Sequence, residues 1–253
     1  VSANKENILK ETKVNFAMYG ESEISLINFL EVFASKHPDF TKVPNLVWKN
    51  KTKTIINHPS KLIYHLDDIP FPDYESFKLS QYPCFDQKII PIITSRGCPY
   101  GCNYCSVRLS MGQSFRPRSP QNVLKEIKYW HKKGFTNFDI NDDCFTLDVN
   151  RAEIICDLII KSKLKIKFQL YNGIRVNNIT LKLLKKLKKA GCFFIAYGCE
   201  SGSQKTLDRI KKNITLDQVR QAVKYTNQAN IRHAVNFIIG HQQETYSDAL
   251  ETL

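Results

Sequence analysis

The sequence lacks any uninterrupted run of about 18 apolar residues, which is the length that a membrane-spanning helix needs. It also lacks the charged stretch, apolar core and small-residue cleavage site of a secretory signal at its N-terminus. Internal repeats and low-complexity segments are absent. We therefore predict no membrane span and no export, and we place the protein in the cytoplasm.

What is present is the composition of a globular protein, with 42% hydrophobic and 24% charged residues. The chain opens on Val1 and stops within "SDALETL", which has the composition of a helix. We therefore expect a piece of a longer protein.

Arginine clusters interleaved with aromatic residues, typical of nucleic-acid-binding proteins, are missing. The net charge of +13 comes mainly from lysines in helical segments such as 181–190. There Leu181, Leu184 and Leu187 form one apolar face, and the lysines occupy the solvated face. We predict no nucleic-acid partner.

Eight cysteines would suit the disulfides of a secreted protein. Three of them lie within one stretch of eight residues, and no export signal precedes them, so metal binding in a reducing compartment is favoured. Cys156 and Cys192 have apolar neighbours and are predicted to be small buried hydrophobic residues.

Strands and helices are predicted to alternate from residue 88 onward. Apolar stretches typical of buried strands occupy 88–95, 135–142, 166–175, 192–199 and 232–240. Helical patterns separate them at 119–134, 148–162, 180–191 and 215–230. Ser119 is expected as an N-cap with Pro120 at the first helical position, and Gly191 is expected to end its helix. This is the pattern of βα units on a parallel sheet, in which binding residues follow the carboxyl ends of strands.

The pattern before residue 88 differs. Residues 14–35 predict a strand, a turn and an amphipathic helix, and residues 43–57 predict a hairpin-like pair of short strands. Residues 66–77 combine two prolines with acidic and aromatic residues, which is typical of an extended linker. We place the domain boundary there.

Cys98, Cys102 and Cys105 have the spacing C-x3-C-x2-C, and Gly97 and Gly101 are expected to let the backbone turn tightly between them. Three thiolates cannot close a tetrahedral zinc site, and no second C-x2-C or H-x3-5-H pattern lies nearby. A 4Fe-4S cluster suits three thiolates, because its fourth iron stays open to a non-protein ligand.

A zinc or redox-thiol loop is the alternative. Cys84 could supply an odd fourth ligand, although we expect it to be structural or a free thiol.

The stretch "CPYGCNYC", with Tyr104 at its aromatic position, resembles the CxxxCxΦC loop of the radical S-adenosylmethionine (SAM) superfamily. The resemblance implies an α/β fold, a partial parallel (β/α)6-type barrel that is truncated here. It also implies that Cys98, Cys102 and Cys105 are the catalytic metal ligands of a 4Fe-4S cluster whose open iron binds SAM. Electron transfer then cleaves SAM to methionine and a 5'-deoxyadenosyl radical. Such a cluster needs a low-potential electron donor, ferredoxin or flavodoxin.

"FDINDDCFT" is similar to the family segment that holds the SAM amino group, which implicates Asp142 and Asp143. A carboxylate beside a bound ammonium is chemically sensible. The alternative is that one of these aspartates caps the following helix.

"YGCESGSQKTLDRIKKN" resembles the family stretch at the end of the fourth strand. It implies that Glu200 and Ser201 face the ribose or methionine part of SAM and that Lys212, or its neighbour Lys211, pairs with the SAM carboxylate. The alternatives are that Ser203 is only a helix cap and that Lys212 is one more solvated lysine.

Arg175 ends the third strand and is expected to reach the cofactor or a substrate acid, with a surface ion pair as the alternative. "FIIGHQQET" is similar to the fifth-strand segment in which Gly240 contacts adenine, although His241 and its neighbours depart from the family pattern. Arg116 and Arg118 match the connection from the cluster loop to the next helix in the same subgroup.

Residues 1–50 resemble the end of the Rossmann-like domain of cobalamin-associated radical SAM proteins, residues 51–85 the linker, and residues 86–253 the radical SAM core. Cobalamin binding is implied only through this subgroup, since neither His58 nor His65 lies in the Asp-x-His-x-x-Gly pattern that supplies the cobalt ligand.

We therefore predict a radical SAM enzyme that either forms the 5'-deoxyadenosyl radical or transfers a methyl group with cobalamin, on an unknown substrate. Two alternatives remain. One is a methylthiotransferase acting on transfer RNA, although the three further cluster cysteines of that family are missing before Cys84. The other is a non-catalytic zinc or redox-thiol binding module.

Overall fold

The computed structural model describes residues 1–51, 53–77 and 89–253. They form two compact units. The first comprises Val1–Tyr64 with Cys105–Ser114, and the second comprises His65–Tyr104 with Phe115–Leu253. Cys84 lies outside the described residues. Within the described ranges, no helix is long and apolar enough to cross a bilayer.

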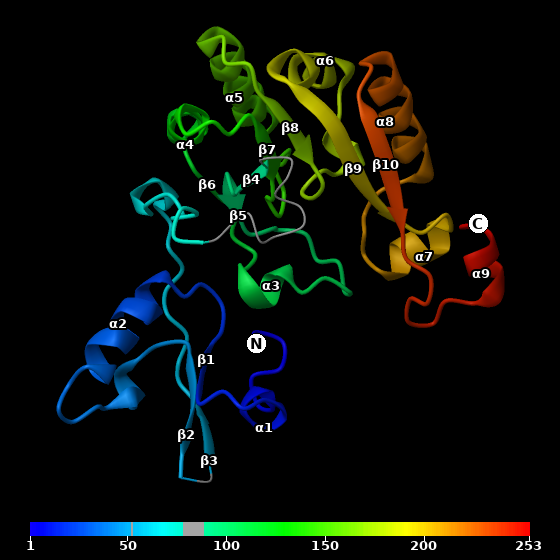
Figure 1. Cartoon of the computed structure of the whole chain (residues 1–253). Helices are drawn as coiled ribbons and strands as arrows, with labels where there is room; N and C mark the ends of the chain where they lie inside the picture. Colours follow the sequence, from blue (N-terminus) through cyan, green and yellow to red (C-terminus); the bar gives the residue numbers. More distant parts are fainter. Residues whose placement is uncertain (52, 78–88) are drawn as a thin grey trace. The chain divides into compact units, whose positions relative to one another are not determined.

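The first unit contains a three-stranded antiparallel sheet in the order β1-β2-β3, shown in blue in Figure 1. Its strands are β1 (Phe16–Met18), β2 (Leu46–Asn50) and β3 (Lys53–Ile56). The predicted strand and helix within 14–35 are confirmed by β1 and α2 (Glu23–Phe33), and the predicted hairpin by β2 and β3. The unit also contains α1 (Ile8–Glu11), α3 (Val107–Ser110) and the 3-10 helix η1 (Phe40–Lys42).

Aromatic rings hold α2 onto this sheet. The ring centroid of Phe16 in β1 lies 5.0 Å from that of Phe29 in α2 and 4.9 Å from that of Phe40. Phe40 in turn lies 5.5 Å from Trp48 in β2. Such tilted and edge-on pairs stabilise by about 1 kcal/mol each beyond the burial of their area.

The second unit contains a five-stranded, fully parallel sheet in the order β10-β9-β8-β7-β4. Its strands are β4 (Ile89–Ile92), β7 (Asn137–Ile140), β8 (Lys167–Leu170), β9 (Cys192–Glu200) and β10 (Arg232–Phe237). The connecting helices are α4 (Pro120–Lys132), α5 (Val149–Ser162), α6 (Leu181–Ala190) and α8 (Leu216–Gln228). Short elements complete it, namely η2 (Leu66–Asp68), β5 (Ser95–Arg96), β6 (Arg116–Pro117), η5 (Val176–Asn178), α7 (Gln204–Arg209) and α9 (Tyr246–Leu250). The predicted parallel βα series is confirmed, with strands shorter than their apolar patterns.

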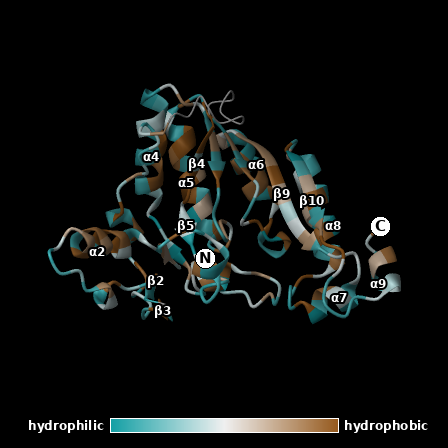
Figure 2. Ribbon diagram, turned by 60° about the horizontal axis from the view of Figure 1, so that its bottom comes forward, coloured by the Kyte–Doolittle hydropathy of each residue, from teal (hydrophilic) through white to brown (hydrophobic). Residues whose placement is uncertain are grey.

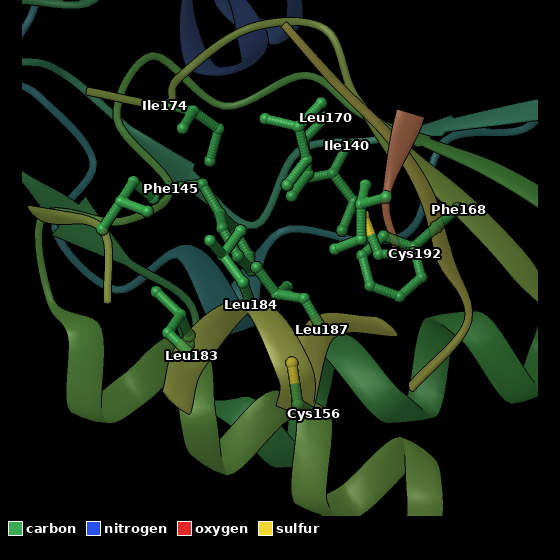
Figure 3. Packing of buried hydrophobic residues seen from close by; sticks show 14 of the residues in the cluster. Ile140, Phe145, Cys156, Phe168, Leu170, Ile174, Leu183, Leu184, Leu187 and Cys192 are labelled. Atoms are coloured by element: carbon green, nitrogen blue, oxygen red, sulfur yellow. The ribbon is translucent and has the colours of Figure 1, made fainter. Parts of the chain in front are cut away.

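The core of this unit lies between the sheet and the helices, which pack side by side as α4, α5, α6 and α8 (Figure 1). Leu184 and Leu187 of α6 are fully buried, as their spacing predicts, and Leu183 joins them (Figure 3). Cys156 and Cys192 are at most 1% exposed and belong to the same core, which confirms their prediction as buried hydrophobic residues. Figure 2 shows hydrophobic residues along α5 and β9, two of the elements that form this core.

Helix ends follow the sequence signals. The Ser119 hydroxyl accepts a hydrogen bond from the Asn122 backbone at 3.1 Å, and Pro120 occupies the first position of α4. Gly191 ends α6 with φ +109°, a left-handed conformation that glycine adopts without strain. The cap of α5 is Asp148, whose side chain accepts from the Arg151 backbone at 2.9 Å.

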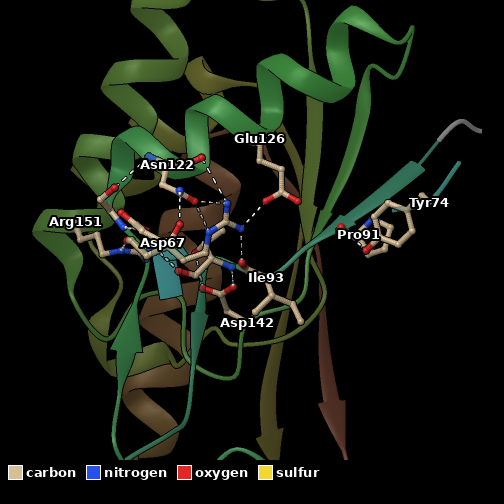
Figure 4. A network of polar contacts seen from close by, with 11 residues as sticks. Asp67, Tyr74, Pro91, Ile93, Asn122, Glu126, Asp142 and Arg151 are labelled. Atoms are coloured by element: carbon tan, nitrogen blue, oxygen red, sulfur yellow. Dashed lines mark hydrogen bonds and ion pairs between the residues drawn. The ribbon is translucent and has the colours of Figure 1, made fainter. Parts of the chain in front are cut away.

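Residues 66–77, predicted as part of a linker, belong to the second unit and make defined contacts within it (Figure 4). Asp67 accepts a hydrogen bond from the Ser119 backbone at 2.8 Å. The Tyr74 hydroxyl donates to the Pro91 backbone oxygen at 3.1 Å, and its ring lies 5.4 Å from that of Trp130. This segment is therefore held in place by hydrogen bonds to other parts of the second unit.

Candidate active site

The cysteine loop is closed at its base by a short pair of strands. β4 ends at Ile92, earlier than the predicted strand 88–95, and Ser95 and Arg96 pair with Pro117 and Arg116 in antiparallel register. Gly97 has φ +82° and makes the predicted tight turn. The prediction for Gly101 is wrong, because its φ is not positive and an added Cβ would meet no atom within 4 Å.

The three loop cysteines are free thiols in different surroundings. Cys98 is half-buried and Cys102 is 8% exposed, both within the second unit. Cys105 is half-buried and begins the segment 105–114 of the first unit. Within the part of the chain that the structure describes, no three His, Cys, Asp or Glu side chains form a metal-binding group.

Arg175 lies against the cysteine loop. Its guanidinium is 3.7 Å from the centre of the Tyr100 ring, and Nη1 lies 3.8 Å from Sγ of Cys102. Nη2 donates to the backbone oxygens of Lys212 and Asn213. Arg175 is 7% exposed, so the alternative of a surface ion pair is wrong. The prediction that Arg175 ends the third strand is wrong, because β8 ends at Leu170, and the loop after it places a buried positive charge beside a loop thiol.

Asp142 anchors the chain that leads into the loop. Its carboxylate accepts hydrogen bonds from the backbone and hydroxyl of Thr94, at 2.5 and 2.6 Å, and from the Ser95 hydroxyl at 2.6 Å. It is 1% exposed, and this burial raises its pKa against the effect of those bonds. Arg151 supports the same segment by donating to the Thr94 backbone oxygen (Figure 4). The alternative of a helix cap is wrong, because Asp148 caps α5.

Asp143 and Cys144 continue this contact. Asp143 accepts a hydrogen bond from the Gly97 backbone at 2.7 Å, and burial raises its pKa. The neighbouring thiol of Cys144 lowers the pKa of Cys98 to about 6, against the opposing effect of burial. The neighbouring Cys98 and burial together raise the pKa of Cys144. The segment after β7 thus contacts both the turn before the first loop cysteine and that cysteine itself.

Lys212 joins three segments that are far apart in sequence. Its Nζ lies 2.8 Å from Oε1 of Glu200, at the end of β9, and 3.2 Å from the hydroxyl of Tyr104, in the cysteine loop. The Lys212 and Glu200 side chains are only 9% and 12% exposed. Lys212 is therefore a buried, paired residue, which excludes the alternative of a solvated lysine, and Lys211 is exposed.

The backbone around Glu200 is adapted to this ion pair. Glu200 has φ +78°, which is costly for a residue other than glycine and is often found at functional sites. A Cβ at Gly198 would lie 2.3 Å from the Glu200 carboxylate, so only glycine leaves room for the pair. His241 contacts the same two residues. Its Nε2 lies 3.3 Å from the Glu200 backbone oxygen, and its ring lies 5.5 Å from the Tyr104 ring.

Ser201 and Ser203 are involved in structural contacts. Ser201 is fully buried, accepts a hydrogen bond from the Ser203 backbone at 3.1 Å and lies 3.3 Å from the Thr252 hydroxyl. Ser203 occupies the N-cap position of α7 but makes no side-chain capping bond.

Gly240 has φ +96° and nothing within 4 Å of an added Cβ, so open space adjoins it. The turn after it is held by Glu244, which accepts from the backbones of Gly240 and His241 at 2.5 and 3.2 Å.

Two features of the site fit an anionic, thiolate-bound cluster. The donor set around the loop is sulfur, the ligand type of iron-sulfur clusters. The second feature is cationic. Nε of Arg175 is buried without a hydrogen-bond partner among the described residues, beside Cys102. These residues match a cofactor that carries negative charge next to the loop.

Comparisons with known proteins identify the family of the chain. The sequence profile of the radical SAM superfamily matches residues 92–253, which include the whole cysteine loop and the sheet after it. This chain belongs to the radical SAM superfamily. Radical SAM enzymes use a 4Fe-4S cluster and SAM, and they need a reductant.

Several curated relatives match nearly the whole chain, and two of them are described here. An uncharacterized methyltransferase of Pyrococcus horikoshii is 30% identical over 241 residues, covering 95% of this chain and 52% of that protein. The anaerobic magnesium-protoporphyrin IX monomethyl ester cyclase of Synechocystis sp. is 25% identical, covering 97% of this chain and 49% of that protein. The chain thus spans about half the length of these curated relatives.

Solved structures show the same fold. The cobalamin-dependent radical SAM enzyme OxsB, with aqua-cobalamin and SAM bound, matches 99% of this chain and 37% of its own, with a TM-score of 0.82 and 21% identity. The radical SAM methyltransferase TsrM of Kitasatospora setae matches 98% of this chain and 50% of its own, with a TM-score of 0.77 and 15% identity.

Sequence reasoning missed four residues of this site, namely Tyr100, Cys144, Gly198 and His241 in its contact with Tyr104. A glycine in the middle of an otherwise apolar strand pattern was the available signal for Gly198. The others depend on contacts between distant segments, for which the sequence carries no signal.

Proposed function

We propose that this chain is the catalytic core of a radical SAM enzyme, in which Cys98, Cys102 and Cys105 hold the 4Fe-4S cluster. Family membership supports the cofactors, and the thiolate spacing supports these three ligands. The single observation that carries the SAM site is the convergence of Tyr104, Glu200 and Lys212, which brings the cysteine loop to the end of β9. When bound, the cluster and SAM supply the electron transfer that cleaves SAM to methionine and a 5'-deoxyadenosyl radical.

The chain's own residues have distinct tasks in this proposal. Lys212 presents a buried ammonium that can pair with a carboxylate of the bound ligand, because Tyr104 and Glu200 fix its position. Arg175 adds a second positive charge beside Cys102, where it can offset the negative charge of a bound cluster.

Asp142 and Asp143 differ in what they can do. Asp142 already accepts three hydrogen bonds from its own chain, so it positions the loop. Asp143 is less buried and keeps acceptor capacity for a ligand ammonium. In the same proposal Ser201 shapes the turn behind Glu200, and Gly240 leaves space for the adenine end of SAM.

The reaction that follows is proposed from the relatives. Several of them are methyltransferases by name, including the cobalamin-dependent TokK of Streptomyces tokunonensis at 23% identity. We therefore propose methyl transfer, assisted by cobalamin bound elsewhere in the full-length protein, on a substrate that is left unassigned. We further propose that a ferredoxin or flavodoxin in the cytoplasm is the electron donor.

The test is anaerobic reconstitution with iron and sulfide, followed by electron paramagnetic resonance of the dithionite-reduced protein with and without SAM. We expect a reduced-cluster signal that changes when SAM is added. The signal should disappear when Cys98, Cys102 and Cys105 are replaced by Ala and persist in Cys156→Ala, which removes a thiol from the core. Retention of zinc, without a cluster, would return the protein to the binding-module alternative.

The SAM site is tested separately. Lys212→Met should form the cluster normally but lose the SAM-dependent change of the signal, whereas Lys211→Met, at the exposed neighbouring position, should keep both.

A further inference from the structure

The end of helix α7 leaves two backbone oxygens for another part of the chain. Lys211 has φ +55°, and its backbone and that of the next residue donate back to the Asp208 and Leu207 oxygens, each at 3.0 Å. This is the pattern of a Schellman helix end, and it uses the backbone oxygens up to Asp208. The Arg209 and Ile210 oxygens follow, and they need donors from outside the helix.

Asn103 in the cysteine loop supplies both donors. Its backbone donates to the Ile210 oxygen at 3.1 Å, and its side-chain Nδ2 donates to the Arg209 oxygen at 3.2 Å. The first bond could be made by any residue except proline, whereas the second needs a side chain that donates. Because a backbone oxygen only accepts hydrogen bonds, the nitrogen of the Asn103 amide must face α7. One residue thus satisfies two helix-end oxygens, across 106 positions in the sequence.

The neighbours of Asn103 make contacts with the same region. Tyr104 follows it, and the Tyr104 hydroxyl lies 3.2 Å from Nζ of Lys212. Cys102 precedes it, and Sγ of Cys102 lies 3.8 Å from Nη1 of Arg175, whose Nη2 donates to the Lys212 backbone oxygen. Asn103 therefore lies in the middle of the contacts that join the cysteine loop to the segment after α7.

We propose that Asn103 is a positioning residue of the SAM site. It holds the second half of the cysteine loop on the end of α7, so that Tyr104 meets Lys212 at hydrogen-bond distance. This inference rests on the proposed function, in which Lys212 pairs with the SAM carboxylate. Without the side-chain bond the loop is less ordered, and SAM must order it at the expense of affinity. The thiols remain in place, so the cluster still forms.

Two substitutions separate hydrogen-bond donation from shape. Asn103→Ala removes the donor at an exposed position. Asn103→Asp keeps the shape but places a carboxylate oxygen against the Arg209 oxygen, at a helix C-terminus that carries partial negative charge. Donation therefore predicts that Asn103→Asp is more harmful than Asn103→Ala, whereas a role in packing alone predicts that it resembles wild type.

Gly101→Asp is the matched control for the added charge. It introduces the same carboxylate two positions away in the same loop, and its Cβ would meet no atom within 4 Å.

Hydrogen exchange followed by mass spectrometry tests the contact on the cluster-free chain. We expect peptides that cover residues 97–104 to exchange faster in Asn103→Ala than in wild type, and fastest in Asn103→Asp. Peptides of α4 should exchange at the wild-type rate in both variants. Equal exchange of the loop in wild type and Asn103→Asp would overturn the proposal, since the bond to Arg209 would then not hold the loop.

A SAM titration tests the consequence after anaerobic reconstitution. All variants should bind as much iron as wild type. The midpoint of the SAM-dependent change in the electron paramagnetic resonance signal should rise about fivefold in Asn103→Ala, the factor expected for one lost hydrogen bond, and by more than about tenfold in Asn103→Asp. Gly101→Asp should change it by less than about twofold.

Three results of the titration would overturn the proposal. Wild-type affinity in both Asn103 variants would show that the contact does not affect SAM. An equal loss in Gly101→Asp and Asn103→Asp would assign the effect to the added charge, and a loss of iron uptake in Asn103→Ala would assign the residue to cluster formation. If wild-type protein takes up no iron, the proposed function fails and the SAM role falls with it, while the exchange measurement still decides whether Asn103 holds the loop on α7.

Discussion

The ion pair between Lys212 and Glu200 gives the sharpest quantitative prediction. Lys212→Met removes the ammonium but keeps the length of the side chain, so a carboxylate whose side chain is only 12% exposed loses the partner 2.8 Å away. Removing one member of a buried pair costs roughly 3–5 kcal/mol. Since both side chains keep some contact with solvent, we expect a loss near the lower end, about 3 kcal/mol.

Lys211→Met is the matched control, because residue 211 is exposed and its substitution should change stability by less than about 0.5 kcal/mol. The assay is urea unfolding followed by circular dichroism. With a slope of about 2–3 kcal/mol/M, Lys212→Met should lower the midpoint by about 1 M or more.

A double variant isolates the pair itself. Adding Glu200→Gln to Lys212→Met removes the unpaired charge, and we expect it to regain more than about 1 kcal/mol of the lost stability. Equal midpoints for Lys212→Met and Lys211→Met would refute the reasoning, since the Lys212–Glu200 contact would then contribute nothing measurable.

Three further predictions concern single residues. In the metal-free chain, alkylation of Cys98 by iodoacetamide should fall to half as the pH is lowered through about 6, because the reactive thiolate exists above its pKa. Burial raises the pKa of Cys156 to about 12 and should keep it unmodified. Mass spectrometry over a pH series measures both, and a Cys98 midpoint near the usual thiol value of about 8.5 would contradict the lowered pKa. Asp148→Ala should destabilise the protein by about 1 kcal/mol through loss of the α5 cap, as measured by urea unfolding. Gly191→Ala should cost more than Gly134→Ala, since both have positive φ but only the Cβ at residue 191 meets a backbone oxygen, at 2.4 Å; equal losses would show that the close approach is relieved without strain.

Much of the sheet domain could be predicted from sequence because its signals are local. The apolar strand patterns, the Ser119 and Pro120 helix start and the Gly191 helix end each depend on a few neighbouring residues, and all are found in the structure. Gly101 was predicted wrongly because a local signal was not sufficient there. A glycine pattern in a loop indicates that a turn is permitted, whereas only the path of the chain decides whether a positive φ is used.

The site could be predicted only in part. The spacing of its cysteines and the match of Lys212 to a family pattern were visible in the sequence, but the contact of Lys212 with Tyr104 joins residues that are 108 positions apart. Asp142 illustrates the same limit. Its position after a strand indicated a site residue, and only the structure shows that Thr94 and Ser95 already use its oxygens.

The side-by-side path of residues 92–98 and 141–144 has a consequence for anyone who would graft this loop onto another scaffold. Each contact along it, from Ile92 with Asn141 to Gly97 with Asp143, is set by the same alignment of the two segments. Deleting one residue from either segment would therefore misalign every later contact at once, including the hydrogen bond between Gly97 and Asp143. The transferable part is the pair of segments together, and a cysteine loop moved without its neighbour would lose the contacts at the turn before its first cysteine.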